Sequence, residues 1–217
     1  MNLANKLTVL RMILVPIFVV VGYLGTLGVI TGEWLGIPMS FWIMNLIFVI
    51  ASITDKLDGY IARSRNQVTT FGKFLDPLAD KILVLTALVM LVEYGKIPAW
   101  IPVIVLAREF LVSGYRLVAV EKGGKVIAAS IWGKLKTVTQ MIAIILVFAD
   151  KFNFFDFVRA TTNQAQAMAS SFQVYMTTPE LVFNGVTSVL MLISVVATIF
   201  SGYDYLKGRK DLFKDKE

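Results

Sequence analysis

Long apolar runs alternate with short polar stretches along the chain. Six runs predict helices, because in each the apolar side chains continue for most of the roughly 20 residues that cross a bilayer: 8–30, 41–63, 73–94, 98–120, 133–150 and 181–206. Glycines and prolines fall in the breaks: Gly32, Gly36, Pro38, Gly95, Pro98, Gly123 and Gly124. The pattern predicts one all-α integral membrane domain over 1–217, with six transmembrane helices and a short N-terminal juxtamembrane segment.

Two stretches need a separate interpretation. The first apolar run, 12–30, follows Lys6 and Arg11 as a signal peptide would. It is too long for a signal sequence, lacks a clear cleavage site and leads into further spans, so we expect it to be retained as the first helix. The segment 151–180 is polar and mixed, which predicts an external loop with some amphipathic helix.

The distribution of positive charge predicts the orientation. Six spans place both termini on one side of the membrane, and only Lys96, Lys151 and Arg159 of the 21 lysines and arginines would then lie on the other side. Some of the remaining cations lie within helices, so the count overstates the loop bias, but the direction survives. The positive-inside rule therefore predicts a multi-pass plasma-membrane protein of bacterial type with cytoplasmic termini.

Composition limits the chemistry. The 217 residues are 57% hydrophobic and include no cysteine and no histidine. This excludes disulfides, thiolate chemistry, the usual zinc sites and histidine acid–base catalysis, so any general base must be Asp, Glu, Lys or Tyr. The net charge is +6. The positions of the charged residues fit membrane topology and the binding of anionic lipids or phosphates, which argues against a nucleic-acid partner.

Four aspartates stand out within this apolar chain. Asp55 and Asp58 are one helical turn apart, as are Asp76 and Asp80, so each pair projects from one helix face. We expect both pairs near the cytoplasmic interface, in the last turns of the second helix and the first turns of the third. Carboxylates there are costly unless a cation neutralises them, and grouped hard oxygen ligands suit Mg²⁺ or Mn²⁺.

These aspartates belong to a longer pattern, Asp55-x2-Asp58-Gly59-x2-Ala62-Arg63-x8-Gly72-x3-Asp76-x3-Asp80. It resembles the signature of the CDP-alcohol phosphotransferase family without a departure. The resemblance implies six transmembrane helices, a homodimer, and transfer of a substituted phosphate from a CDP-linked donor to an alcohol with release of CMP. It also implies two divalent cations bound by the four aspartates, with Asp80 acting in addition as the base that activates the alcohol. The alternative is a set of interfacial aspartates paired with Lys56, Lys73 and Lys81.

The same pattern predicts a site for the CDP donor. Gly59, Ala62 and Gly72 are small enough for a nucleotide to approach the backbone closely, and Arg63 can pair with a phosphate in bidentate fashion. The resemblance adds three polar residues to this site: Asn5, Thr8 and Thr69. Helix capping by Asn5 or Thr8 and ordinary loop polarity at Thr69 are the alternatives.

Cations in the fourth and fifth helices predict how the acceptor binds. Arg108 lies beside Glu109 inside an apolar span, Arg116 follows two turns later, and Lys134 and Lys136 open the fifth helix. Facing the metals, these four cations would bind an acceptor that already carries phosphate, which points to glycerol 3-phosphate. GKFLDPLADK, AREF and GKLKT also look like the branch of the family that uses this acceptor. Alternatively, Arg108 pairs with Glu109 or another subunit, and the lysines snorkel to the interface.

Three other functions remain open at this point. Sister activities would use inositol phosphate, serine or phosphatidylglycerol as acceptor; the motif does not separate them, and only the arginine and lysine set argues for a phosphorylated alcohol. Intramembrane aromatic prenyltransferases also use aspartates and Mg²⁺, but their motifs lie far apart in sequence. A cation transporter would carry polar residues through the full membrane depth, whereas the acids here gather at one side.

Overall fold

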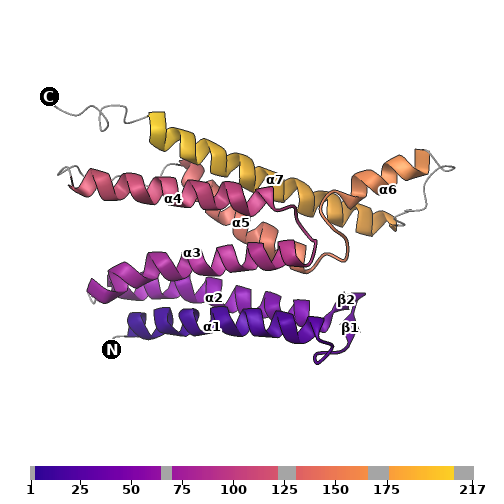
Figure 1. The fold of residues 1–217 in the computed structure, drawn as a ribbon, viewed down its shortest axis with the longest axis horizontal. Helices are drawn as coiled ribbons and strands as arrows, with labels where there is room; N and C mark the ends of the chain where they lie inside the picture. Colours follow the sequence, from indigo (N-terminus) through magenta and orange to yellow (C-terminus); the bar gives the residue numbers. More distant parts are fainter. Residues whose placement is uncertain (1–2, 65–69, 122–130, 166–175, 208–217) are drawn as a thin grey trace.

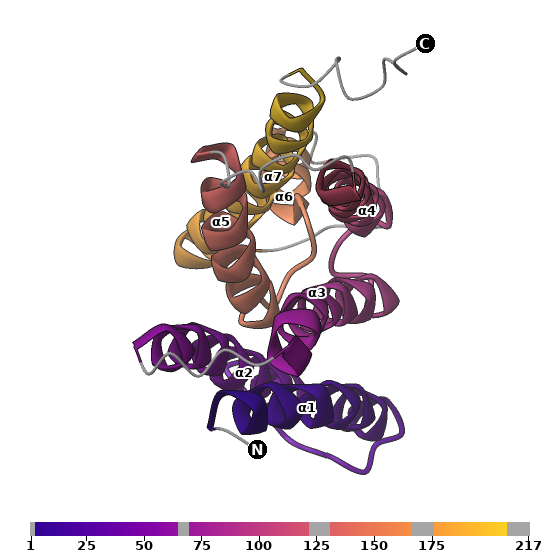
Figure 2. The ribbon, with the colours of Figure 1, turned by 90° about the vertical axis from the view of Figure 1, so that its left-hand side faces the viewer.

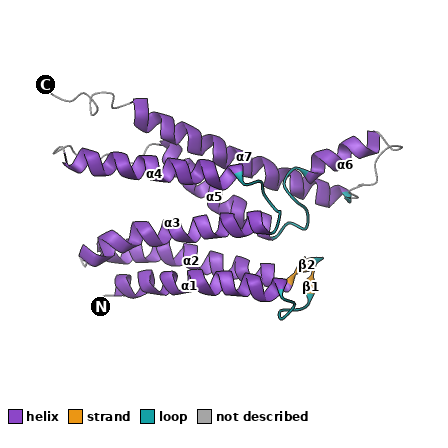
Figure 3. Cartoon of the chain, viewed as in Figure 1, coloured by secondary structure: helices purple, strands orange, loops and turns teal. Residues whose placement is uncertain are grey.

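The computed structural model of the chain describes residues 3–64, 70–121, 131–165 and 176–207, and side chains over 7–54, 78–79, 81–115, 131–161 and 176–207. Within these residues the chain is mainly helical, with one small hairpin (Figure 3). The elements are α1 (Leu3–Thr26), β1 (Glu33–Trp34), β2 (Ile37–Pro38), α2 (Met39–Ser64), α3 (Thr70–Glu93), α4 (Trp100–Glu121), α5 (Ile131–Phe148), α6 (Asp156–Ala165) and α7 (Thr178–Lys207).

The long helices form two groups. Helix α1 packs against α2 and α3 in one group, α7 packs against α4 and α5 in the other, and α2 and α3 join the groups through α5 and α4 (Figures 1 and 2). The start of α1, the carboxyl end of α2, the amino end of α3 and the end of α7 lie at the left-hand end of the bundle in Figure 1. The segments that carry the four aspartates therefore share one end of the molecule.

Aromatic side chains fill the centre where the groups meet. Phe148 of α5 is fully buried and lies edge-on to Phe18 of α1 at 5.7 Å and to Phe41 of α2 at 6.0 Å between ring centroids. The same core includes Met44 and Met191, both fully buried. Between helices that face lipid, close packing of this kind supplies the association energy, because lipid chains are as apolar as the side chains themselves.

The outer surface is strongly apolar. Large side chains such as Ile13, Val20, Val103 and Phe110 are more than half exposed. Three helical stretches of the described part are long and apolar enough to cross a membrane: Leu7–Thr26, Ile131–Phe148 and Thr178–Lys207. These observations confirm a mainly helical fold with candidate membrane spans, and the number of six spans stays a prediction.

The helix boundaries differ from the predicted ones in two consequential places. Helix α1 begins at Leu3, so residues predicted as a separate juxtamembrane segment continue the first helix. Helix α3 begins at Thr70, three residues earlier than predicted, so Asp80 lies about three turns into the helix rather than in its first turns. Boundary errors of this size arise because polar residues extend a helix that the apolar pattern does not mark.

The hairpin after α1 was not predicted. Glu33 pairs with Pro38 and Trp34 with Ile37, and Leu35 and Gly36 form the two-residue turn with φ of 57° and 73°. Positive φ at both positions is the conformation that matches the twist of a tight hairpin. The strands are too short to show an alternating pattern, so the sequence marked only a break.

The predicted external segment contains the short helix α6, as expected from its mixed composition. Its amino end is fixed by α7, because the Asn184 side chain accepts a hydrogen bond from the Phe157 amide at 2.9 Å. The Asn184 amide group also donates to the Asp150 carboxylate at 2.9 Å. These contacts join the α5–α6 connection to α7 at the end of the bundle opposite the aspartate-bearing segments (Figure 1).

Candidate active site

The backbone brings the two aspartate pairs to neighbouring helices. Asp55 and Asp58 lie in the last three turns of α2, Asp76 and Asp80 lie in the amino-terminal half of α3, and the two helices contact each other. Their side chains are outside the described part of the structure, so metal binding and the base role of Asp80 stay predictions. Among the side chains that are described, no group of three or more acidic residues could hold a metal ion.

The residues predicted to bind the CDP donor likewise lie on neighbouring helices. Asn5 lies in α1, Gly59, Ala62 and Arg63 lie in α2, and Gly72 lies in α3. The side chains of these five residues are not described, and Thr69 lies outside the described residues. Thr8 is described, and its side chain is 1% exposed on α1. Because α1 packs against both α2 and α3, this buried hydroxyl lies on a helix that borders the predicted site.

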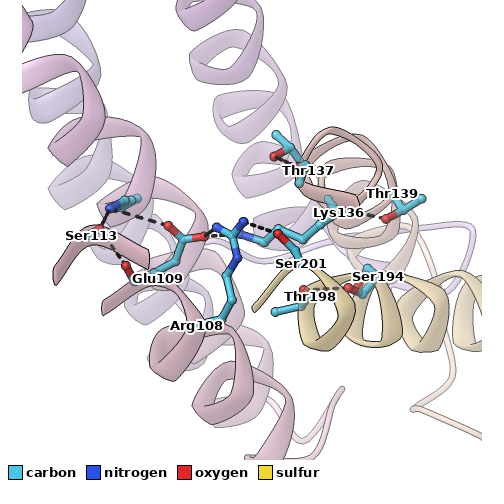
Figure 4. A network of polar contacts seen from close by, with 11 residues as sticks. Arg108, Glu109, Ser113, Lys136, Thr137, Thr139, Ser194, Thr198 and Ser201 are labelled. Atoms are coloured by element: carbon cyan, nitrogen blue, oxygen red, sulfur yellow. Dashed lines mark hydrogen bonds and ion pairs between the residues drawn. The ribbon is translucent and has the colours of Figure 1, made fainter. Parts of the chain in front are cut away.

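A polar cluster occupies the interior beside these segments, and Glu109 of α4 lies at its centre (Figure 4). Its Oε1 accepts a hydrogen bond from Arg108 Nη1 at 3.0 Å and a second, shorter one from Lys136 Nζ of α5. Its Oε2 lies 3.6 Å from Lys81 Nζ of α3. One carboxylate thus contacts cations from three helices, which we call the Glu109 cluster: Lys81, Arg108, Glu109 and Lys136.

Arg108 extends this cluster to the last helix. Its Nη2 donates to the Ser201 hydroxyl of α7 (Figure 4). Its guanidinium carbon lies 5.8 Å from the centre of the Tyr205 ring. Gly202 lies beside this crossing, where a Cβ would make an ordinary van der Waals contact with Arg108 Cγ at 3.6 Å. Arg108 Nε is buried and has no hydrogen-bond partner among the described residues. A donor of this kind is available to an anionic ligand.

Lys81 connects the cluster to the helix that carries Asp76 and Asp80. Its ammonium donates to the Ser113 hydroxyl of α4, which in turn donates to the Glu109 carbonyl at 2.6 Å. Lys81 directly follows Asp80 in the chain. One member of the cluster, Lys81, is therefore the neighbour of the predicted base in α3.

The cluster carries more positive than negative charge. Lys136 side-chain exposure is 8%, Arg108 13%, Glu109 14% and Lys81 32%. Three cations from three helices thus converge on one carboxylate. Charges inside a membrane protein normally pair with one another or with a bound ion, so a cluster of this kind is a candidate site for an anionic ligand.

The structure brings together only part of the predicted acceptor set. Arg108 and Lys136 lie in the cluster, whereas Lys134 is exposed on α5 and forms no ion pair with the described residues of the cluster. The Arg116 side chain is outside the described part. The sequence indicates Lys81 only as a partner of an aspartate and Glu109 only as a partner of Arg108. Their sole sequence signal was adjacency to Asp80 and Arg108, which says nothing of contacts between helices.

The fold and the cluster define a class of protein: a helical membrane protein with acidic segments and a buried cationic cluster around one internal region. The model of one family, described as CDP-alcohol phosphatidyltransferase, matches residues 1–200. The chain belongs to this family.

Curated relatives lie within the same family. A CDP-diacylglycerol–glycerol-3-phosphate 3-phosphatidyltransferase of Bacillus subtilis (strain 168) is 47% identical over 147 residues, which are 66% of this chain and 74% of that protein. A protein of the same name from Haemophilus influenzae is 44% identical over 147 residues, 66% of this chain and 73% of its own. Another, from Rickettsia bellii (strain RML369-C), is 35% identical over 214 residues, covering 98% of this chain and 97% of that protein.

Proposed function

We propose that the chain transfers the phosphatidyl group of CDP-diacylglycerol to glycerol 3-phosphate, forming phosphatidylglycerol phosphate and releasing CMP. Family membership supports the donor and the reaction type, and the relatives just described carry names for this activity. The observation that carries the choice of acceptor is the Glu109 cluster, because it gathers Lys81, Arg108 and Lys136 from three helices and leaves Arg108 Nε as a buried donor with no hydrogen-bond partner among the described residues. Guanidinium and ammonium groups suit a phosphate monoester better than an acceptor without phosphate, such as serine.

The proposed topology has six spans, with the aspartate end of the bundle facing the cytoplasm of a bacterial-type plasma membrane. Three spans meet the length and hydropathy of a membrane helix, and the remaining long helices α2, α3 and α4 run alongside them. The start of α1 and the end of α7 lie at one end of the bundle, as an even number of crossings requires (Figure 1). The proposed working unit is a homodimer.

The donor set suits two divalent cations. Asp55, Asp58, Asp76 and Asp80 would hold Mg²⁺ or Mn²⁺, since both ions prefer carboxylate oxygens and two paired helices offer four such groups. When bound, the ions would neutralise the diphosphate of the donor and stabilise the leaving CMP. Because the outer surface of the bundle is apolar, the acyl chains of the donor would remain in lipid.

The protein residues then account for orientation and proton transfer. Arg108, Lys136 and Lys81 bind the phosphate of the acceptor and so hold its free primary hydroxyl toward α3. Asp80 accepts the hydroxyl proton as the oxygen attacks the lipid-side phosphorus. The new bond joins that oxygen to phosphorus, the bond to the bridging oxygen of the diphosphate breaks, and CMP departs with the electron pair.

The test is CMP release from CDP-diacylglycerol by purified protein, with and without glycerol 3-phosphate, and with serine, inositol phosphate or phosphatidylglycerol in parallel. We expect release that depends on glycerol 3-phosphate and yields phosphatidylglycerol phosphate, and little release in Asp80→Asn. A preference for an unphosphorylated acceptor would refute the assignment of the acceptor. Undiminished turnover in Asp80→Asn would refute the base.

A further inference from the structure

We propose that Arg11 of α1 is a positioning residue for the metal ions: its guanidinium pairs with Asp55 and holds that carboxylate in the orientation that binds a divalent cation. This inference rests on the proposed function and adds to it a residue that binds no substrate itself. The burial of Arg11, the register of α1 against α2 and α3, and the distribution of acidic residues over these helices carry it.

Arg11 is completely buried. Its exposed fraction is 0%, and among the described residues it is the largest side chain with full burial. A guanidinium stays charged at physiological pH, and the cost of burying that charge is offset only by an anionic partner with good geometry. Inside an apolar bundle, such an arginine indicates an acidic group on a neighbouring helix.

One row of buried residues runs along α1, and a second row runs along α2. The members of each row are alternately three and four residues apart, which keeps them on one face of the helix. The row of α1 is Thr8, Arg11, Val15, Phe18 and Gly22, and the row of α2 is Met44, Phe48 and Ala51. The same spacing continues along the α2 backbone to Asp55 and Asp58.

A contact near the opposite end of the bundle fixes how the two rows align. Helices α1 and α2 run antiparallel (Figure 1), and a Cβ at Gly22 would lie 3.2 Å from Met44 Cε. Arg11 lies eleven residues before Gly22, and Asp55 lies eleven residues after Met44. Each step covers roughly 16 Å toward the same end of the bundle, so Arg11 is level with Asp55 to within about one helical turn.

Helix α3 gives the same level independently. It runs parallel to α1 (Figure 1), and a Cβ at Gly22 would lie 2.6 Å from Met90 Cε. Ala79 lies eleven residues before Met90, is fully buried, and stands between the two aspartates of α3 in the sequence. Arg11 therefore lies at the depth of both aspartate pairs, where the proposed metal ions would bind.

The distribution of acidic residues leaves few partners for Arg11. Helices α1, α2, α3 and α5 together contain five acidic residues, of which four are the aspartates of the motif. The fifth, Glu93, is the last residue of α3 and lies at the opposite end of the bundle (Figure 1). The register then selects Asp55 among the four aspartates.

An arginine in this position would act through the metal ligand. A partner that orients a ligand from behind typically contributes about 10–100-fold to metal affinity. The guanidinium presents its N–H groups in a fixed planar fork that matches a carboxylate, whereas a lysine offers one mobile ammonium. Arg11 would thus hold Asp55 ionised and in one orientation.

The experiment compares Arg11→Met and Arg11→Lys with a matched control, Arg159→Met. The Arg159 side chain is 72% exposed on α6 and lies 3.3 Å from Asp156, so the control removes an arginine and its ion pair far from the aspartates. For each purified, metal-free protein, Mn²⁺ binding is titrated by electron paramagnetic resonance, which requires no turnover. CMP release is then measured as a function of Mn²⁺ concentration.

We expect Arg11→Met to weaken Mn²⁺ binding by roughly tenfold or more, and to raise the Mn²⁺ concentration for half-maximal CMP release by a similar factor. Saturating Mn²⁺ should restore most of the activity, because the metal ligands themselves remain. Arg11→Lys should be intermediate, and Arg159→Met should match the wild type. Unchanged or tighter Mn²⁺ binding in Arg11→Met would overturn the inference. A loss of activity that saturating Mn²⁺ does not relieve would overturn it too, since that indicates distortion of the bundle.

The same measurements separate this inference from the proposed function. If the wild type binds Mn²⁺ but transfers to another acceptor, the assignment of glycerol 3-phosphate fails, and the Mn²⁺ titration of the Arg11 variants still decides the inference. If the wild type binds no Mn²⁺, the inference fails, even where transfer to glycerol 3-phosphate is observed. Should Arg11→Met not fold, Arg11→Lys decides: wild-type Mn²⁺ affinity in that variant would overturn the inference.

Discussion

Replacement of Lys96 by methionine should destabilise the protein without impairing its chemistry. Lys96 lies between α3 and α4, is 8% exposed, and its ammonium donates to three successive carbonyls after α5: Asp150 at 2.8 Å, Lys151 at 3.0 Å and Phe152 at 3.4 Å. Burial lowers the pKa of this amine, and the nearby Asp150 and Asp156 carboxylates oppose that effect. The residue is thus a buried cation that satisfies the carbonyl groups of the connection after α5.

The expected loss follows from these contacts. Two of the hydrogen bonds are short and come from a charged donor, and each is worth ~1.5 kcal/mol or more, so the free energy of unfolding should fall by about 3 kcal/mol. The third, at 3.4 Å, adds little. For a chain of this size each kcal/mol shifts the midpoint by roughly 2–4 °C, so Lys96→Met should melt roughly 6–12 °C below the wild type.

The assay is thermal unfolding in detergent, followed by tryptophan fluorescence, with Lys151→Met as matched control. Lys151 is half exposed and lies 3.7 Å from Glu180, and such surface pairs contribute ~0–1 kcal/mol. Transfer activity at 25 °C should stay near the wild-type value, because Lys96 lies at the opposite end of α3 from the aspartates. A Lys96→Met midpoint within about 2 °C of the wild type, or an equal loss in Lys151→Met, would refute the reasoning.

Four further outcomes are expected. Asp80→Asn should reduce CMP release by roughly 100-fold or more through loss of the proposed base, measured by single-turnover assay. Arg108→Lys keeps the charge but loses the fork that contacts two helices, so KM for glycerol 3-phosphate should rise roughly tenfold with little change for the donor. Gly25→Ala should destabilise the protein by ~1–3 kcal/mol, because its Cβ would lie 2.4 Å from Ser40 Cβ, whereas Gly114→Ala meets nothing within 4 Å and should melt no lower than the wild type. Chelation by EDTA should abolish CMP release, and added Mg²⁺ or Mn²⁺ should restore it; full activity in EDTA would contradict the metal assignment.

Much of the fold could be predicted from local patterns. The apolar runs predicted each of the long helices, because a membrane helix satisfies its own backbone and needs only length and hydropathy. The mixed composition of 151–180 predicted a helix there, and α6 confirms it. The hairpin around Leu35 and Gly36 and the early starts of α1 and α3 were missed, since two-residue strands and polar helix ends leave no periodic signal.

The candidate site, like the fold, could be predicted only in part from the sequence. The sequence by itself determined the family, because the spacing of four aspartates, two glycines and an arginine is a property of the chain, and the family model confirms that resemblance. Only the tertiary structure placed Lys81, Glu109 and Lys136 around one point, although they come from α3, α4 and α5. The physical reason is that periodicity gives the face of a helix but not its rotation and depth against its neighbours, which side-chain packing between helices sets.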